Sequence, residues 1–413
     1  MLLCNLNEVA PGMRVGAAVL CPRSPDRPLL KPGAELTTSI LRLLRDRGVH
    51  QLWISDGLSE DLDNFVDESL TAAKMRMFEE MKTSFRDMNE RTLCMSHASR
   101  FRNSIMELVT EAMSSRLLGS LTDPLFQSDA SIMSHSANVA YLAVLLGLDL
   151  ETYIVRCRSR LAPSDAFDLV SLGLAAMMHD IGKSGAGGAL DGVHEAHLDD
   201  DDEAPEGYRG HTREGYDLLR ASRLSASAKQ AILNHHQRFD GNGWSGARPV
   251  QRRPAAEGDD PRRQAGDKIH IFTRIVSVAN TLDNLMRSVD GSPRPAVAAL
   301  FDLASERFNG WFDPVVRAVA LRRIMPFGVG SKVRLSDGRD AVVVAPNASE
   351  PCWPFVRPLD KGPQLTKDSE QNATMNLAET PGVWITHAVG CNVEPWLFRL
   401  ADRDHVIRIA AAA

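Results

Sequence analysis

Apolar residues recur at helical spacing through most of the chain. The stretches 67–89 and 99–121 alternate charged and apolar residues with almost no glycine or proline, so each predicts a long helix. These two helices are expected either to pack within the monomer or to pair two copies as a homodimer. Beyond them the pattern predicts six more helices, at 131–148, 165–180, 212–221, 225–236, 267–288 and 313–324. The fold class is therefore predicted to be mainly α.

Both ends of the chain follow a different pattern. Segments 14–22 and 50–55 have the β-branched and aromatic content of strands, and 36–48 between them predicts a helix. Near the other end, 331–347 forms two alternating runs around an Asp-Gly pair, which is a hairpin signal. We therefore predict a helical bundle with a small α+β unit before it and a β-rich tail after it. The expected units are 1–66 (α+β), 67–130 (helical linker), 131–327 (helical domain) and 328–413 (β-rich segment).

Two stretches interrupt the helices. Residues 185–210 are rich in glycine and acidic residues, and 246–267 are rich in Pro, Arg, Gly and Asp, so both predict surface loops. The acidic run from Asp199 to Glu203 lacks the alternating ligands and the turn glycine of a calcium loop. We interpret it as solvated.

Composition narrows the functional class. The 413 residues carry 47 basic and 53 acidic side chains, a net charge of −6, which argues against binding of a nucleic-acid polymer. The six cysteines are scattered without a C-x-x-C pair, as expected in a reducing compartment. The N-terminus lacks the features of a signal peptide, and the apolar runs are too short to span a bilayer. A cytoplasmic protein without a membrane span is expected.

Several histidines occupy positions that the apolar pattern predicts to face the protein interior. His135 begins one apolar helix, His179 ends another, and the pair His235–His236 ends a third. Converging imidazoles are costly to bury and repel one another when protonated. A divalent cation removes both costs, because it binds neutral imidazole nitrogens directly.

Asp180 suggests how many cations to expect. A carboxylate beside a ligand histidine can place one oxygen on each of two metals, and two neighbouring metals are the usual arrangement for phosphoester hydrolysis. Lys183 follows three residues later, on the same side if the helix or turn continues. It would offer a positive charge to a phosphate oxygen.

An ordered series of motifs extends this interpretation. In chain order they are HSANVA (135–140), HDIGK (179–183), HTREGYDLL (211–219), NHHQRFDGNGW (234–244) and RIVSVANTLDNLM (274–286). The series resembles an HD-GYP domain, the branch of the HD metal phosphohydrolases that cleaves cyclic di-GMP. The segments before and after it also resemble those that usually flank such domains.

The resemblance implies a role for each matching residue. It implies two divalent ions, iron or manganese being favoured and zinc left open. Lys183 would contact the scissile phosphate, and Asp180 and Lys183 would be the catalytic residues. The implied first-metal ligands are His135, His179, Asp180 and Asn280, and the second-metal ligands are Asp180, His211, His235 and His236. The implied substrate-binding residues are Lys183, Asp240, Gly241, Gly243, Trp244 and Asp283. For Asp283, contact with substrate or with a histidine outside the metal's ligand set is favoured over replacement of the missing ligand, which stays open.

The chain departs from the family pattern at four places. Trp244-Ser245 replaces Tyr-Pro, and Gln237 replaces a glutamate after the paired histidines. Ser131 replaces a carboxylate that gives some members a third metal, so two metals are the expected maximum. Asn280 replaces the aspartate that should complete the first site, and it offers one neutral oxygen instead.

Three functions follow from this pattern. The first is a metal-dependent phosphodiesterase that hydrolyses cyclic di-GMP to pGpG, with GMP as an open further product, in bacterial second-messenger signalling. The second is a catalytically impaired relative that binds a nucleotide or a signalling partner such as a diguanylate cyclase. The third, a phosphohydrolase of the wider HD class acting on another nucleotide, is disfavoured by the intact D-G-x-G loop at 240–243.

Overall fold

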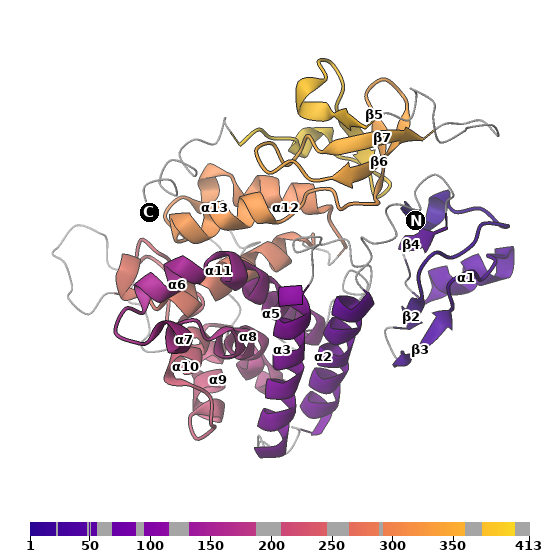
Figure 1. Ribbon diagram of the computed structural model, residues 1–413. Coiled ribbons are helices and arrows are strands. Elements are labelled where there is room, and N and C mark those ends of the chain that lie inside the picture. The colour runs from indigo at the N-terminus through magenta and orange to yellow at the C-terminus, as the bar shows by residue number, and fades with distance from the viewer. Residues whose placement is uncertain are drawn as a thin grey trace.

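A helical bundle makes up most of the molecule. A six-stranded sheet lies above it and a small N-terminal unit beside it (Figure 1). The computed structural model describes residues 1–21, 24–47, 49, 51–55, 68–87, 95–114, 132–186, 208–245, 264–288, 292–359 and 374–400. This is the mainly α fold, with β-rich flanking units, that the sequence predicts.

The centre of the bundle is α5 (Ile132–Asp149), which packs against α8 (Leu169–Met178) and α11 (Ile271–Leu285). Its side chains are buried nearly all the way round, from Ser134 to Gly147. Within the described residues it is the one helix long and apolar enough to cross a membrane, yet 72% of that window is buried inside the protein. Burial at the centre of the core accounts for its apolarity.

The two long charged helices also belong to this core. The first, α2 (Glu68–Asp87), packs against α3 (Met95–Ser114), and both contact α5. Their apolar faces, including Met77, Met81 and Phe101, are fully or almost fully buried. These helices therefore pack within the monomer, and the pairing of two copies as a homodimer stays a prediction.

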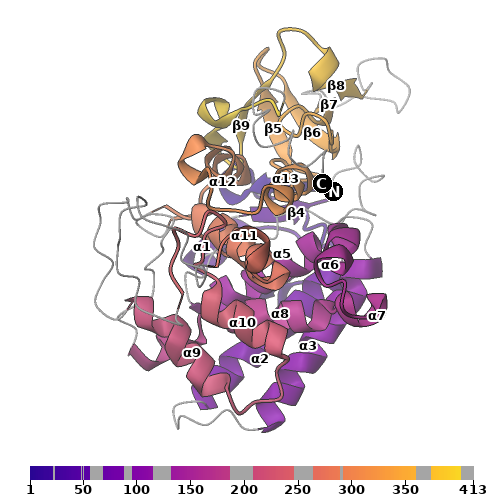
Figure 2. The ribbon, with the colours of Figure 1, turned by 90° about the vertical axis from the view of Figure 1, so that its left-hand side faces the viewer.

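The remaining helices match the predicted positions with some differences at their ends. The predicted helix 165–180 is split into α7 (Pro163–Ala166) and α8, because Asp168 caps α8 by accepting a hydrogen bond from the Ser171 amide at 2.9 Å. The short α6 (Glu151–Cys157) and α12 (Ala296–Leu303) were not predicted, and neither N-cap makes a side-chain bond that would mark the start of the helix. The other helices are α9 (His211–Leu219), α10 (Ala226–Asn234) and α13 (Pro314–Arg323). Figure 2 shows α8, α9 and α10 side by side beneath α11.

The N-terminal unit folds around its own apolar cluster. Strand β1 (Leu2–Asn5) pairs with β4 (Gln51–Ile54), and β2 (Val19–Cys21) pairs with β3 (Ser24–Leu30). Thr37 caps α1 (Thr38–Asp46), whose Leu41 and Leu44 contribute to that cluster. Of the predicted strand 14–22 only the last part forms β2.

The C-terminal sheet is antiparallel throughout, in the order β10-β9-β5-β6-β7-β8. The predicted hairpin is β5 with β6, and Gly338 takes the positive φ (+86°) that its turn requires. Helices α12 and α13 lie between this sheet and the bundle (Figure 1). The strands are β5 (Lys332–Leu335), β6 (Asp340–Ala345), β7 (Phe355–Leu359), β8 (Met375–Asn376), β9 (Ile385–Ala388) and β10 (Cys391–Asn392).

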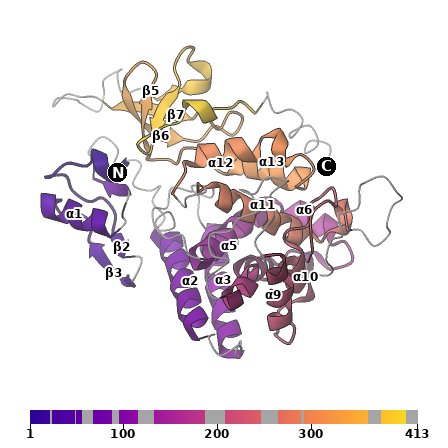
Figure 3. The same ribbon diagram turned by 180° about the vertical axis from the view of Figure 1, so that it is seen from behind.

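The first and last units of the chain contact each other. The Leu3 amide donates to the Gly330 carbonyl at 2.8 Å, and Lys332 pairs with Glu8 at 3.3 Å. Figure 3, from behind, shows the N-terminal unit next to the sheet. The four-part division of the chain stays a prediction, since this contact joins the two outer units.

Candidate metal centre

The predicted histidines and Asp180 converge at the ends of the bundle helices. His179 is the C-cap of α8 and His235 the C-cap of α10, while His211 is the first residue of α9. His135 projects from the first turn of α5. As whole residues, these four histidines and Asp180 are at most 5% exposed. Residues from positions 135 to 235 of the chain are thus brought into one buried site.

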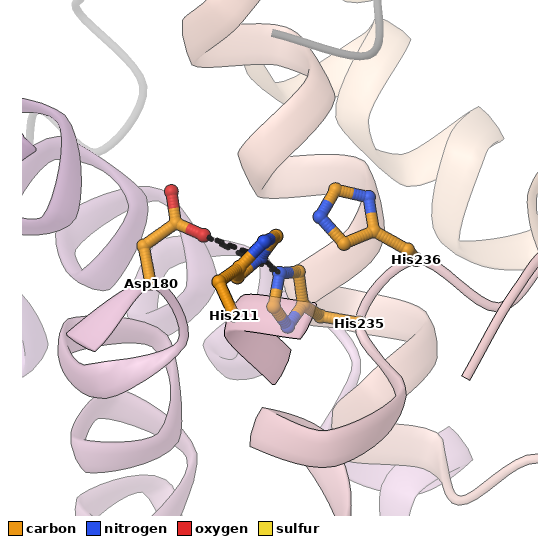
Figure 4. Close-up of side chains that lie close together, drawn as sticks. All are labelled: Asp180, His211, His235 and His236. Atoms are coloured by element: carbon orange, nitrogen blue, oxygen red, sulfur yellow. Dashed lines mark hydrogen bonds and ion pairs between the residues drawn. The ribbon is translucent and has the colours of Figure 1, made fainter. Parts of the chain in front are cut away.

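Asp180 stands between two groups of donor atoms. Its Oδ2 lies 3.6 Å from His135 Nε2 and 3.5 Å from His179 Nε2. Its Oδ1 lies 3.1 Å from His211 Nε2 and 3.5 Å from His235 Nε2. Within each group the ligand atoms lie within 4.8 Å of one another, and His236 joins the second group. Figure 4 shows the second group around the shared carboxylate.

The backbone fixes which nitrogen of each ring faces the centre. His179 Nδ1 donates to the Ala176 carbonyl at 2.7 Å, and His235 Nδ1 donates to the Ile232 carbonyl at 2.9 Å. His211 Nδ1 makes the same bond to Tyr208, again three residues earlier. A carbonyl can only accept, so Nδ1 carries the proton and Nε2 presents a lone pair.

The donor set fits divalent cations. The Nε2 atoms of His211 and His235 approach to 3.3 Å, and those of His135 and His179 to 3.2 Å, so bare lone pairs face each other and a carboxylate. Asp180 Oδ1 has no hydrogen-bond partner among the described residues although two imidazoles surround it, because an Nε2 lone pair cannot donate. A cation between these atoms would turn the repulsion into coordination.

Protonation states agree with this fit. Burial lowers the pKa of His179, His235 and His236, in two of these cases well below the usual value. Burial alone would raise the pKa of Asp180, but neighbouring His179 and Lys183 hold it well below its usual range. At neutral pH His179, His235 and His236 are therefore neutral and Asp180 is ionised, the form in which these groups bind metals.

Lys183 lies at the edge of the shared carboxylate. Its Nζ is 2.6 Å from Asp180 Oδ2, and the side chain is 5% exposed. Gly182 beside it allows the turn to approach α9, since an added Cβ would collide with the His211 carbonyl. The ammonium supplies one positive charge where a phosphate group would need it.

Asp283 lies against a histidine. Its Oδ2 accepts from His135 Nδ1 at 2.7 Å, so it orients that ring and leaves His135 Nε2 facing Asp180. The partner is an implied metal ligand, whereas the sequence analysis favoured contact with substrate or with a histidine outside the ligand set; the substrate role of Asp283 stays a prediction. Asn280, one turn earlier on α11, is 5% exposed, and its Oδ1 accepts from Asn284 Nδ2 at 3.1 Å. Its role as a ligand stays a prediction.

The D-G-x-G loop is a tight turn held by its own backbone amides. The amides of Asp240, Gly241 and Asn242 donate to the Gly310 carbonyl, the Arg238 carbonyl and Asp240 Oδ1 respectively. Gly241 has a positive φ of +79°. The tight turn therefore already uses these three amides within the protein. A substrate role for the loop stays a prediction.

No role was predicted for Tyr208 from the sequence. It is 1% exposed, and its ring lies 5.2 Å from the His211 ring and 5.2 Å from Lys183 Nζ. Its only signal was an aromatic residue just before the HTREGYDLL motif. Ser131 and the predicted acidic loop, by contrast, lie outside the described residues.

Comparison with known proteins agrees with this geometry. The HD domain family model matches residues 132–285, the segment that holds every residue of the two clusters. Residues 132–285 of this chain are thus similar to the HD domain family. A cyclic di-GMP phosphodiesterase of Pseudomonas aeruginosa, PA4108, is 25% identical over 380 residues, which cover 84% of this chain and 83% of that protein. The resemblance to HD-GYP proteins is thereby confirmed, and a hydrolase of the HD class is supported.

One solved structure is also similar. It is Bd1817, a HDG"Y"P protein from Bdellovibrio bacteriovorus, with 15% identity and a TM-score of 0.43, covering 78% of this chain and 97% of that one.

Proposed function

We propose that this HD-domain protein is a metal-dependent phosphodiesterase that hydrolyses cyclic di-GMP to pGpG, with GMP as a further product to be tested. One observation carries the proposal: the two oxygens of Asp180 face two separate groups of buried imidazoles. The substrate is suggested by the relative described as a cyclic di-GMP phosphodiesterase.

The chain offers two sets of ligands. His135, His179 and Asp180 would hold one ion, with Asn280 as a neutral additional donor. The second ion would have Asp180 and the three imidazoles of His211, His235 and His236. A histidine–carboxylate set suits iron or manganese. When bound, two such ions would supply Lewis acidity at the phosphate and activate a water for attack.

Three features of the protein suit this site to a phosphodiester: fixed histidine tautomers, a nearby positive charge and burial. The backbone carbonyls at 176, 208 and 232 hold the Nδ1 protons, so each ring keeps one tautomer. Lys183 carries positive charge next to Asp180 and would stabilise the charge that develops on a non-bridging phosphate oxygen. Burial keeps bulk water away from these groups, which strengthens their electrostatic effect.

Asn280 supports a second candidate, a catalytically impaired relative that binds a nucleotide or a signalling protein. A carboxamide oxygen that already accepts from Asn284 is a weaker ligand than a carboxylate. In this candidate the helical domain would recognise its partner without turnover. A cytoplasmic location and a diguanylate cyclase partner remain predictions.

The test is hydrolysis of cyclic di-GMP by the full chain loaded with Mn²⁺, or with Fe²⁺ under anaerobic conditions. Asp180→Ala should abolish metal-dependent turnover while the far-UV circular dichroism stays near wild type. Asp217→Ala is the matched control, because this exposed aspartate on α9 pairs only locally with Arg213. Binding without turnover would favour the second candidate, and turnover of other nucleotides alone would overturn the substrate assignment.

A further inference from the structure

The indole of Trp244 stacks on the imidazole of His236. The ring centroids are 4.1 Å apart and the planes are inclined by 12°. The same indole stands edge-on to the His211 ring, at 5.6 Å and 89°. Trp244 is 8% exposed. One face of an implied metal ligand is therefore covered by an aromatic plane, and little of that plane is left for solvent.

The backbone brings the two rings together. The Trp244 amide donates to the His236 carbonyl at 3.2 Å, which closes the loop onto its own start. Gly243 allows this closure, because an added Cβ would collide with the backbone of Arg238 and His236. The stack therefore follows from the main-chain path of the loop.

Two other rings of this group are held by the backbone. His211 and His235 each donate Nδ1–H to the carbonyl three residues earlier. The face of the His236 ring packs against a parallel indole. An imidazole that binds a cation becomes electron-poor, and the face of an indole attracts such a group more strongly than it attracts a neutral ring. The stack should thus favour the metal-loaded form of His236.

We propose that Trp244 is a positioning residue for the second metal, which holds His236 in its ligating orientation, and that it is not primarily a platform for a guanine base. The inference rests on the metal centre proposed above. Partners that orient metal-ligating histidines are worth about 10–100-fold in metal affinity. Loss of the indole should weaken the second ion by about tenfold or more and leave the first ion unchanged.

The experiment measures Mn²⁺ binding to the metal-free full chain by equilibrium dialysis and by tryptophan fluorescence. Wild type should bind Mn²⁺ with quenching of part of the emission, because Mn²⁺ on His236 would lie close to the indole. Trp244→Phe should lose that quenching and keep Mn²⁺ affinity within a few-fold, since a phenyl ring can still stack. Trp244→Ala should lose about tenfold or more at one of two sites. Trp384→Phe, an exposed indole in the C-terminal region, is the control and should quench like wild type.

The outcomes separate two kinds of failure. Wild type that binds no Mn²⁺, Fe²⁺ or Zn²⁺ would refute the proposed metal centre itself. Wild type that binds two ions, with Trp244→Ala binding both equally well, would overturn the role of Trp244 alone. Wild-type quenching by Mn²⁺ in Trp244→Phe would also overturn the role of Trp244, because the quenched fluorescence would then come from another tryptophan. If Trp244→Ala does not fold, the quenching and affinity of Trp244→Phe decide the question.

Discussion

Replacing Asp283 with alanine tests the arrangement of two metal sites. Asp283 is not one of the residues first implied as metal ligands, but it contacts one of them. Its Oδ2 accepts from His135 Nδ1 at 2.7 Å, and both side chains are 7% exposed. The bond joins α11 to α5 across 148 positions. Without it, the His135 ring loses the group that fixes its tautomer and its orientation toward Asp180.

The expected size follows from two independent estimates. A buried hydrogen bond to a charged group contributes about 1.5–3 kcal/mol. Partners of metal-ligating histidines contribute about 10–100-fold in metal affinity, which equals about 1.4–2.8 kcal/mol. The two ranges agree, so Asp283→Ala should weaken the first ion by about 10–100-fold. Asp283→Asn keeps a neutral acceptor and should cost about tenfold or less.

The assay is equilibrium dialysis of metal-free protein against Mn²⁺, with bound metal measured by mass spectrometry. One ion should keep its wild-type affinity while the other weakens. Asp302→Ala is the control, because Asp302 forms a comparable ion pair with Arg294 at 2.8 Å on α12. Unchanged binding of both ions, or equal loss of both in a folded variant, would refute the division of ligands into two groups.

Three further predictions follow from particular contacts. Lys183→Ala should lower kcat/KM by an amount that corresponds to about 2–4 kcal/mol and should leave the bound metal unchanged. The reason is that the Lys183 side chain would stabilise the phosphate and would not bind the metal. A loss of metal as large as in the histidine variants would contradict this. Asn280→Asp should raise metal occupancy and kcat at limiting Mn²⁺, because it adds a full charge to the first site, and full two-metal occupancy in untreated wild type would argue against it. His270 caps α11 by accepting from the Phe272 amide at 3.1 Å, and burial followed by the charges of Arg158 and Arg274 lowers its pKa to about 4. The unfolded chain, with a His pKa of about 6.5, then takes up the proton first, so this residue's stabilisation is complete above pH 6.5 and is lost as pH falls toward 4, by about 2 kcal/mol between pH 7 and pH 5. His270→Asn keeps a capping oxygen and should reduce the pH dependence of urea unfolding by that amount; equal slopes for both proteins would count against it.

Local signals on the chain indicated most of the elements correctly. Helical spacing located α2, α3, α5, α9, α10, α11 and α13, because each has an apolar face several turns long. It missed α6 and α12, which are short and lack a side-chain cap. It also joined α7 to α8, since apolar spacing continues past the cap that Asp168 provides.

The sequence by itself determined which residues are candidates for the site. The order and spacing of the histidines, with Asp180 beside His179, are properties of short segments, and so is the ring orientation at His179, His211 and His235. In each case the acceptor carbonyl lies only three residues away. Local backbone geometry is enough to set these rings.

Only the tertiary structure decided how those residues are shared. The resemblance implied that Asp180 is shared by two ligand groups, but no spacing could show which of its oxygens faces which imidazoles, or that Asp283 lies against His135. Nor could it show that loop closure through Gly243 lays the Trp244 indole on His236. These contacts depend on how α5, α8, α9, α10 and α11 pack against one another. Where these helices meet, the close-packed core sets the direction of each side chain, and no local sequence pattern encodes that packing.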